Sequence, residues 1–345
     1  MVMSKALSNP KFQWPVVGHK NIAAYLQNSI VKNKVSHAYL FFGPAGIGKT
    51  AMAESFVNSL VCRQADHRDG LIPCGLCDCC LQIKNRIHPD VYWLERPTDP
   101  KTGRVKKNIS IDQVRELKSK LSLRPFLDSY KAAVVTEAQH LSQEAANALL
   151  KTLEEPTAKT VLIILTDNFS WIPKTIVSRC QVLKFLPVAQ SEITASLVER
   201  GAEKLAAAKL AALAYGRPGI AINYFSDPES LQAYQEKIKE FLALTQADLI
   251  QRFRFIQSEF GYAETDEIFQ TLNIWLKTLR DLALIKTQNQ NLVTNISAGS
   301  DLEKIANGYS TAKLTNLLRQ VALAKKYLAA NVSPRLTLEN FVLNF

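Results

Sequence analysis

Residues 43–50 read Gly43-Pro44-Ala45-Gly46-Ile47-Gly48-Lys49-Thr50, the pattern of a phosphate-binding loop. Its glycines let successive backbone N–H groups point at phosphates, the lysine binds the terminal phosphates, and the threonine hydroxyl holds Mg²⁺. A buried-strand run, Ala38 to Phe42, precedes the loop, and helix formers follow from Ala51 to Leu60. The sequence therefore predicts a site for ATP or ADP, with Mg²⁺ on Thr50. Whether the nucleotide is turned over stays open.

Length and composition predict a multidomain cytoplasmic protein. A chain of 345 residues is long enough for two or three domains, each with its own core. It has no run of about 18 apolar residues, and residues 1–10 are too polar for a signal peptide. The net charge of +11 favours an acidic partner such as nucleic acid, although the basic residues are scattered. The densest basic group, between Lys101 and Lys107, is equally well explained as a solvated loop.

Five of the six cysteines lie between positions 62 and 80. In a reducing compartment such crowding indicates a metal site rather than disulfides. Four of them are separated by eleven, two and two residues and offer four thiolates for a tetrahedral, structural Zn²⁺. These are Cys62, Cys74, Cys77 and Cys80. Cys79 is the alternative to Cys80, since the sequence does not show which sulfur faces inward.

Strand-like and helix-like segments alternate from Val91 to Phe185, which predicts an α/β fold with a parallel sheet and helices on both faces. A capping box at Ser110 and Gln113 begins one helix, and Pro156 ends another that starts near Leu141. The expected strands after the phosphate-binding loop are Val91 to Leu94, Ala132 to Val135, Val161 to Leu165 and Gln181 to Phe185.

The strand that ends at Val135 leads into Thr136 and Glu137. In phosphate-binding-loop ATPases, carboxylates that place Mg²⁺ and polarise water stand at a strand end, which we expect beside the loop strand. One acid is present where two are expected. Glu137 is therefore a weak candidate base and Thr136 a poor metal ligand. Alternatively, Glu137 is a solvated residue at a strand end.

Two longer strings carry a resemblance to a known family. They are Asn147-Ala148-Leu149-Leu150-Lys151-Thr152-Leu153-Glu154-Glu155-Pro156 and Thr175-Ile176-Val177-Ser178-Arg179-Cys180. Together with the phosphate-binding loop and the cysteine knuckle, they resemble the bacterial clamp-loader branch of the AAA+ ATPases. The similarity spans roughly residues 15–220. The tail, from Asn331 to Glu339, is similar to the collar domain of the same family.

The resemblance implies a hetero-pentameric ring with motor (gamma/tau) and delta subunits. Such a ring opens a sliding clamp and closes it around primer-template DNA in replication. It implies that Arg179 completes a neighbour's ATP site as an arginine finger, the alternative being a local ion pair. Thr166 stands where the family has a sensor of the γ-phosphate. Its alternative role is to cap the turn through Asp167 and Asn168.

The sequence departs from the motor subunits of this family at two places, and in both it resembles a non-motor, stator-type subunit. Besides Thr136, glycine and proline in Gly216-Arg217-Pro218-Gly219 occupy the place where a motor starts a helix with a sensor arginine. We therefore expect ATP or ADP binding with slow or absent turnover. The alternatives are an active gamma/tau-like motor and a stand-alone zinc-knuckle DNA-binding protein.

Composition predicts three domains. Residues 1–186 would form the AAA+ nucleotide-binding domain, with the zinc knuckle at 62–80. Residues 187–230 would form a small helical lid, because Pro187 and polar residues follow the last strand. Residues 231–345 would form an all-α collar for oligomerisation, because their apolar residues recur at helical intervals.

Overall fold

The computed structural model describes the chain except residues 1–10, 64–70, 127–129, 262, 264 and 296–298. It divides into two compact units. One contains the chain up to residue 199 together with residues 214–220, and the other contains residues 200–213 and 221–345. Each unit is described separately below.

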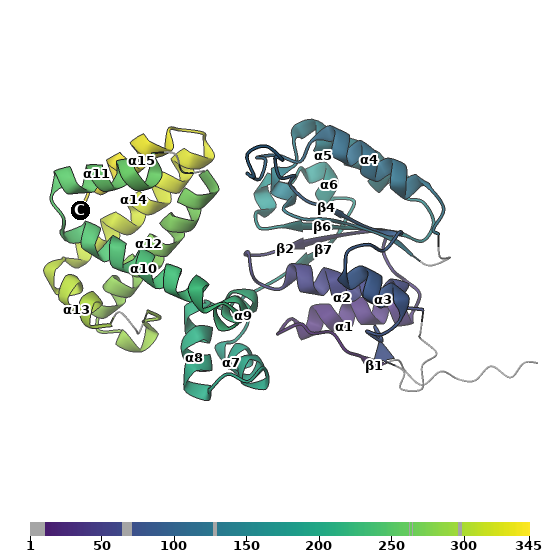
Figure 1. The fold of residues 1–345 in the computed structure, drawn as a ribbon, viewed down its shortest axis with the longest axis horizontal. Coiled ribbons are helices and arrows are strands. Elements are labelled where there is room, and N and C mark those ends of the chain that lie inside the picture. The colour runs from purple at the N-terminus through teal and green to yellow at the C-terminus, as the bar shows by residue number, and fades with distance from the viewer. Residues whose placement is uncertain (1–10, 64–70, 127–129, 262, 264, 296–298) are drawn as a thin grey trace, which may run out of the picture. The chain divides into compact units, whose positions relative to one another are not determined.

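A five-stranded parallel sheet forms the centre of the first unit, in the order β4-β5-β6-β2-β7 (Figure 1). This confirms the predicted α/β class. Apolar runs buried on both faces are typical of parallel strands, and all seven residues of β6 are buried. The strands are β2 (Ala38–Phe42), β4 (Val91–Leu94), β5 (Lys131–Val135), β6 (Thr160–Thr166) and β7 (Gln181–Lys184).

Helices cover both faces of this sheet (Figure 1). One face packs against α1 (Lys20–Val31), α2 (Lys49–Val61) and α3 (Asp78–Lys84). The opposite face packs against α4 (Ile111–Ser122), α5 (Gln143–Glu154) and α6 (Lys174–Val177). A separate two-stranded parallel sheet joins β1 (Lys11–Phe12) to β3 (Leu71–Ile72).

Helix boundaries follow the local signals closely. The capping box predicted at Ser110 is present, with its hydroxyl accepting from Gln113 and the Gln113 side chain accepting from the Ser110 N–H. The next helix begins at Gln143 rather than near Leu141, because Ser142 caps it by accepting from Ala145. It ends before Pro156, as expected.

The expected position of the strand that carries Glu137 was wrong. β5 is not beside the loop strand β2, because β6 lies between them. β6 pairs with β2 along one edge and with β5 along the other. Thr136 and Glu137 are therefore two strand spacings, about 9.6 Å, from the end of β2.

The chain continues entirely in helices after β7. The segment with glycine and proline leads directly into a helix, α9 (Pro218–Ser226), because proline is well tolerated in the first turn of a helix. Before it lie α7 (Gln190–Glu199) and α8 (Lys204–Leu213). After it lie α10 (Pro228–Gln246), α11 (Leu249–Phe260), α12 (Thr265–Lys286), α13 (Gly299–Gly308), α14 (Thr311–Ala329) and α15 (Pro334–Val342).

The C-terminal helices share one apolar core in the second unit. Trp275 lies at its centre and stacks on Phe241 and Phe341, with ring centroids 5.1 and 5.3 Å away.

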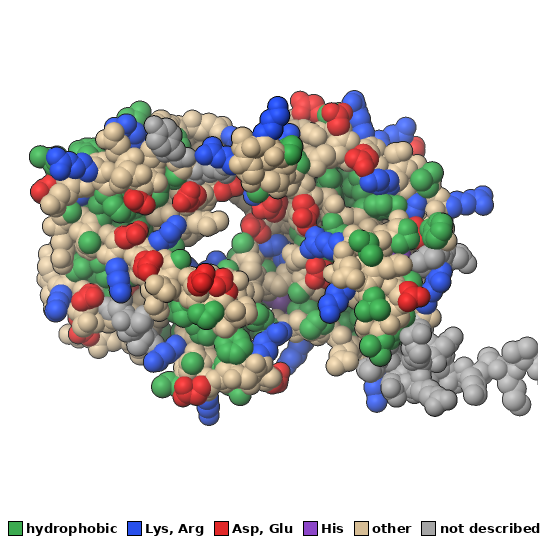
Figure 2. All heavy atoms as spheres, viewed as in Figure 1, with side chains coloured by type: hydrophobic (Ala, Val, Ile, Leu, Met, Phe, Trp, Pro, Cys, Tyr) green, Lys and Arg blue, Asp and Glu red, His purple; other side chains and the backbone are tan. Residues whose placement is uncertain are grey.

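The domain boundaries at residues 186 and 230 stay a prediction. None of the described helices combines the length and the apolar character needed to cross a bilayer. Lys and Arg side chains are spread over the face in Figure 2, with Asp and Glu among them.

Candidate nucleotide site and cysteine centre

A cavity of about 380 Å³ lies at the carboxyl ends of the strands, beside the phosphate-binding loop. It brings the loop together with residues that follow β5 and β6, which are far apart in sequence. Ligands of open parallel sheets bind at this edge. The lining residues are Ala45, Gly46, Gly48, Lys49, Thr50, Ala51, Thr136, Glu137, Leu165, Asp167 and Gly219. Gly43, Pro44 and Ile47 complete the loop but are not among them.

The backbone of the loop needs its glycines. Gly46 and Gly48 have φ values of +74° and +110°, which residues with a Cβ rarely adopt. A Cβ on Gly46 would also lie 2.8 Å from Ile220 Cγ1. Because α2 begins at Lys49, the first N–H groups of that helix are available at the cavity. The local structure is therefore that of an anion cradle.

The Lys49 side chain is 7% exposed and is held by the chain itself. Its ammonium donates to the Gly43 carbonyl, to the Pro44 carbonyl at 2.9 Å and to Asp167 Oδ1 at 2.6 Å. Burial lowers the pKa of Lys49, and the nearby Asp167 carboxylate opposes that shift. The cation expected to bind phosphate is thus neutralised by a carboxylate in the same cavity.

Sequence reasoning missed Asp167. It follows β6 directly, and β6 pairs with β2 so that Thr166 is opposite Phe42 at the strand ends. Parallel neighbouring strands bring their carboxyl ends to one edge, so an acid one residue beyond β6 faces the phosphate-binding loop. The position of Asp167 directly after a buried strand is visible in the sequence, but it indicates a cavity residue only once β6 is known to be the neighbour of β2.

Glu137 is also held by a cation. Arg96 binds its carboxylate in a two-point interaction, with Nε–Oε2 at 2.9 Å and Nη2–Oε1 at 3.0 Å. Arg96 is mostly buried, and Glu137 has a left-handed backbone with φ of +47°. The carboxylate lines the cavity but is oriented by Arg96, which sequence reasoning also missed. Thr136 lines the cavity beside it.

Thr166 is buried and does not line the cavity. Its hydroxyl accepts from the Asn168 N–H at 3.1 Å, and its single proton is shared between two acceptors, Gln139 Oε1 at 3.0 Å and the Asn168 carbonyl at 3.1 Å. These contacts match the local-capping alternative. The sensor role stays a prediction.

Arg179 follows α6 and lies outside the cavity. Its guanidinium pairs with Glu154 at 2.6 Å and donates to the Thr175 carbonyl at 2.9 Å. The side chain is 35% exposed. In the single chain the guanidinium is therefore bound locally, which does not test its position in an assembled ring.

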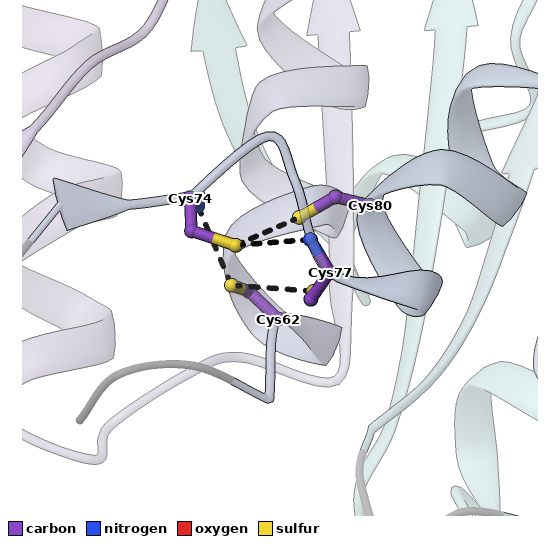
Figure 3. Close-up of side chains that lie close together, drawn as sticks. All are labelled: Cys62, Cys74, Cys77 and Cys80. Atoms are coloured by element: carbon purple, nitrogen blue, oxygen red, sulfur yellow. Dashed lines mark hydrogen bonds between the residues drawn. The ribbon is translucent and has the colours of Figure 1, made fainter. Parts of the chain in front are cut away.

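Four cysteine side chains converge between α2 and α3 (Figure 3). Cys62 follows α2, Cys74 and Cys77 lie on the loop after β3, and Cys80 is on α3. The four sulfur atoms all lie within 4.8 Å of one another. Cys79 is not one of them, although it is as deeply buried as Cys80. The structure thus gathers Cys80 rather than Cys79.

The spacing of the sulfurs fits a tetrahedral Zn²⁺. Thiolates about 2.3 Å from such an ion are about 3.8 Å apart. Here Cys62 and Cys77 are 4.0 Å apart, and Cys74 and Cys80 are 3.9 Å apart. The pKa of Cys80 is raised above its usual range by its hydrogen bond to Cys62 and by burial. Metal binding to these thiols would therefore release protons.

Comparison with known proteins identifies the family. The family described as "DNA polymerase III, delta subunit" matches residues 18–189. The DNA polymerase III subunit delta' of Bacillus subtilis (strain 168) is 29% identical over 320 residues, 92% of this chain and 93% of that protein. The chain belongs to the DNA polymerase III clamp-loader family. Within this family, the similarity to the delta' subunit of Bacillus subtilis extends over nearly the whole length of both chains.

Two other clamp-loader relatives match shorter regions. Subunit delta' of Pseudomonas aeruginosa is 39% identical over 145 residues, 42% of each chain. Subunit tau of Bacillus subtilis (strain 168) is 36% identical over 178 residues, 52% of this chain. The clamp-loader chain spans only 30% of the length of that tau protein. The similarity to tau is therefore confined to part of each protein.

Replacing Asp167 with Asn should tighten nucleotide binding. The amide cannot neutralise Lys49, so the phosphate no longer competes with a carboxylate. We expect ADP to bind about fivefold more tightly, equivalent to about 1 kcal/mol for a partly exposed ion pair. Titration calorimetry on the full chain measures this, with Asp112→Asn on α4 as the control. Unchanged or weaker binding would show that Asp167 does not compete with the ligand.

Replacing Cys80 with Ala should remove the metal, whereas replacing Cys79 with Ala should not. Three thiolates hold Zn²⁺ much less tightly than four, and the Cys79 sulfur lies outside the cluster. Elemental analysis of the purified chains should give about one zinc per wild-type or Cys79→Ala chain and much less for Cys80→Ala. Retention of zinc in the Cys80 variant together with its loss in the Cys79 variant would reverse the assignment.

Proposed function

We propose that this clamp-loader subunit is a delta', stator-type subunit. It binds ATP or ADP with Mg²⁺ in its own cavity, hydrolyses the nucleotide slowly or not at all, and supplies Arg179 to a neighbouring ATPase subunit. One observation carries the proposal: each carboxylate that lines the cavity is already paired with a cation, Glu137 with Arg96 and Asp167 with Lys49.

Hydrolysis needs a carboxylate that can orient or polarise water beside the γ-phosphate. The Glu137 carboxylate is bound at two points by Arg96, so both of its oxygens already have a partner and are directed at the guanidinium rather than at water. Thr136 has no charge with which to assist a metal ion. Binding requires less, since the loop backbone, Lys49 and the Thr50 hydroxyl suffice to hold phosphates and Mg²⁺. The cavity therefore favours binding over turnover.

The position of Arg179 allows it to change partners. Its ion pair with Glu154 is partly exposed at both side chains, and such pairs contribute about 1 kcal/mol or less. A neighbour's γ-phosphate carries more charge than Glu154 and would compete well for the guanidinium. A trans role thus needs only a side-chain movement.

The proposed partners follow from the family. They are the gamma/tau motor subunits and a delta subunit in a hetero-pentamer, the sliding clamp, and primer-template DNA bound through the complex, all in the cytoplasm. The cysteine centre would hold a structural Zn²⁺, because four protein sulfurs fill every position of a tetrahedral ion.

A second candidate is an active motor subunit. The similarity to tau over 178 residues, together with the complete phosphate-binding loop, favours it. It requires Glu137 to leave Arg96 when ATP binds. The paired state of both acids in the cavity makes it the weaker candidate.

Replacing Arg179 with Ala should impair a reconstituted clamp loader without impairing its assembly. An arginine finger contributes about 10³-fold or more to turnover at the site it completes. We expect clamp loading and clamp- and DNA-stimulated ATPase activity to fall, while gel filtration still shows the whole complex. Arg115→Ala, on α4 outside the cavity, is the control. Normal clamp loading by the Arg179 variant would contradict the trans role.

A further inference from the structure

A second cavity of the first unit lies away from the phosphate-binding loop. It is a groove of about 580 Å³ along β4, and it shares no lining residue with the nucleotide cavity. Its walls are residues 86–88 before β4, residues 95–97 after it, and one side of α4 between Gln113 and Lys120. The proposed nucleotide chemistry does not use it.

β4 is the last strand of the sheet at this side, and among the described residues it pairs only with β5. The Ala132 N–H donates to the Asp90 carbonyl and the Thr136 N–H to the Leu94 carbonyl. In a parallel pair this alternation turns the backbone of Trp93 away from β5, toward the groove. Within the described chain no backbone group pairs with the Trp93 N–H or carbonyl. An open edge with unpaired backbone groups is a template for pairing with another chain.

Two side-chain donors in the groove also lack acceptors. His88 is 3% exposed, and its Nδ1 accepts from the Asp90 N–H at 3.1 Å, which places its proton on Nε2. His88 Nε2 and Trp93 Nε1 are both buried without a hydrogen-bond partner. A buried donor without an acceptor destabilises the folded chain. Both residues line the groove, and because the two nitrogens are themselves buried, a ligand's acceptor oxygens would reach them after a small movement of the side chains.

The charged side chains of the groove narrow the choice of ligand. Three of them are basic, namely Arg86, Arg96 and Lys120, and two are acidic, namely Glu95 and Glu116. The Arg86 guanidinium lies 4.3 Å from the centre of the Trp93 ring. Each basic group is paired with a glutamate of the chain. A nucleic acid would need unpaired cations along its phosphates, whereas a peptide needs mainly backbone partners and a slight positive balance.

We propose that this groove binds an extended, acidic peptide segment of a partner protein, which adds a strand to β4. The segment's N–H and carbonyl groups pair with the outward-facing backbone of Trp93, and its oxygens accept from His88 and the Trp93 indole. Side chains alternate along an added strand, so one set contacts α4 and Lys120. The proposal does not depend on nucleotide binding or on Arg179.

The test uses the full-length chain and a fluorescein-labelled hexapeptide, Glu-Val-Glu-Val-Glu-Val, with binding followed by fluorescence anisotropy. We expect a Kd below about 1 mM. Trp93→Phe keeps the ring but removes the indole N–H, and should weaken binding about fivefold or more. Lys120→Glu should weaken it similarly through repulsion. Lys118→Glu, on the same helix but outside the groove, should leave it unchanged.

A second probe separates strand addition from simple charge attraction. The same peptide with every backbone nitrogen methylated keeps its carboxylates but cannot form a ladder, so it should not bind. Equal binding of the methylated peptide would overturn the proposal, as would unchanged binding by both the Trp93 and Lys120 variants. Failure of the unmodified peptide to bind by about 1 mM would also overturn it. The proposal would also be overturned if the chain bound a single-stranded oligonucleotide instead of the peptide and if Lys120→Glu abolished that binding.

Discussion

The contact between the Lys49 ammonium and the Asp167 carboxylate is the interaction on which the nucleotide cavity depends. It exists because β6 lies beside β2, so that the residue after one strand meets the loop after the other. The same order sets β5 one strand further away, where Arg96 holds Glu137. The order of the strands thus determines which charges meet in the cavity, and both acids there are paired with a cation.

A second constraint shapes the segment between α2 and α3. Four sulfurs from three separate pieces of chain come within 4.8 Å of one another, and Cys79 is not among them. A metal bound at this point would stabilise the segment, because it would link these pieces of chain. The knuckle also begins α3, whose last turn leads to Arg86 and the groove along β4.

Local patterns predicted much of this molecule. The loop from Gly43 to Thr50, the capping box at Ser110 and the strand from Val91 to Leu94 all depend on residues close in sequence. The sequence could not show that β6 separates β2 from β5, because strand order depends on contacts between distant segments. For the same reason Asp167 and Arg96 escaped notice. The departure from the motor pattern at Gly216–Gly219 did not show that a helix begins at Pro218, although proline suits the first turn of a helix.

The central claim is that this cavity holds nucleotide without turning it over. Single-turnover mixing of the isolated chain with radiolabelled ATP and Mg²⁺ tests it most directly, with Lys49→Ala as the control for binding. The account predicts that the wild-type chain retains ATP that the variant does not bind, and that the bound ATP stays uncleaved over many minutes. Release of phosphate within seconds by the wild-type chain, abolished by Lys49→Ala, would contradict it.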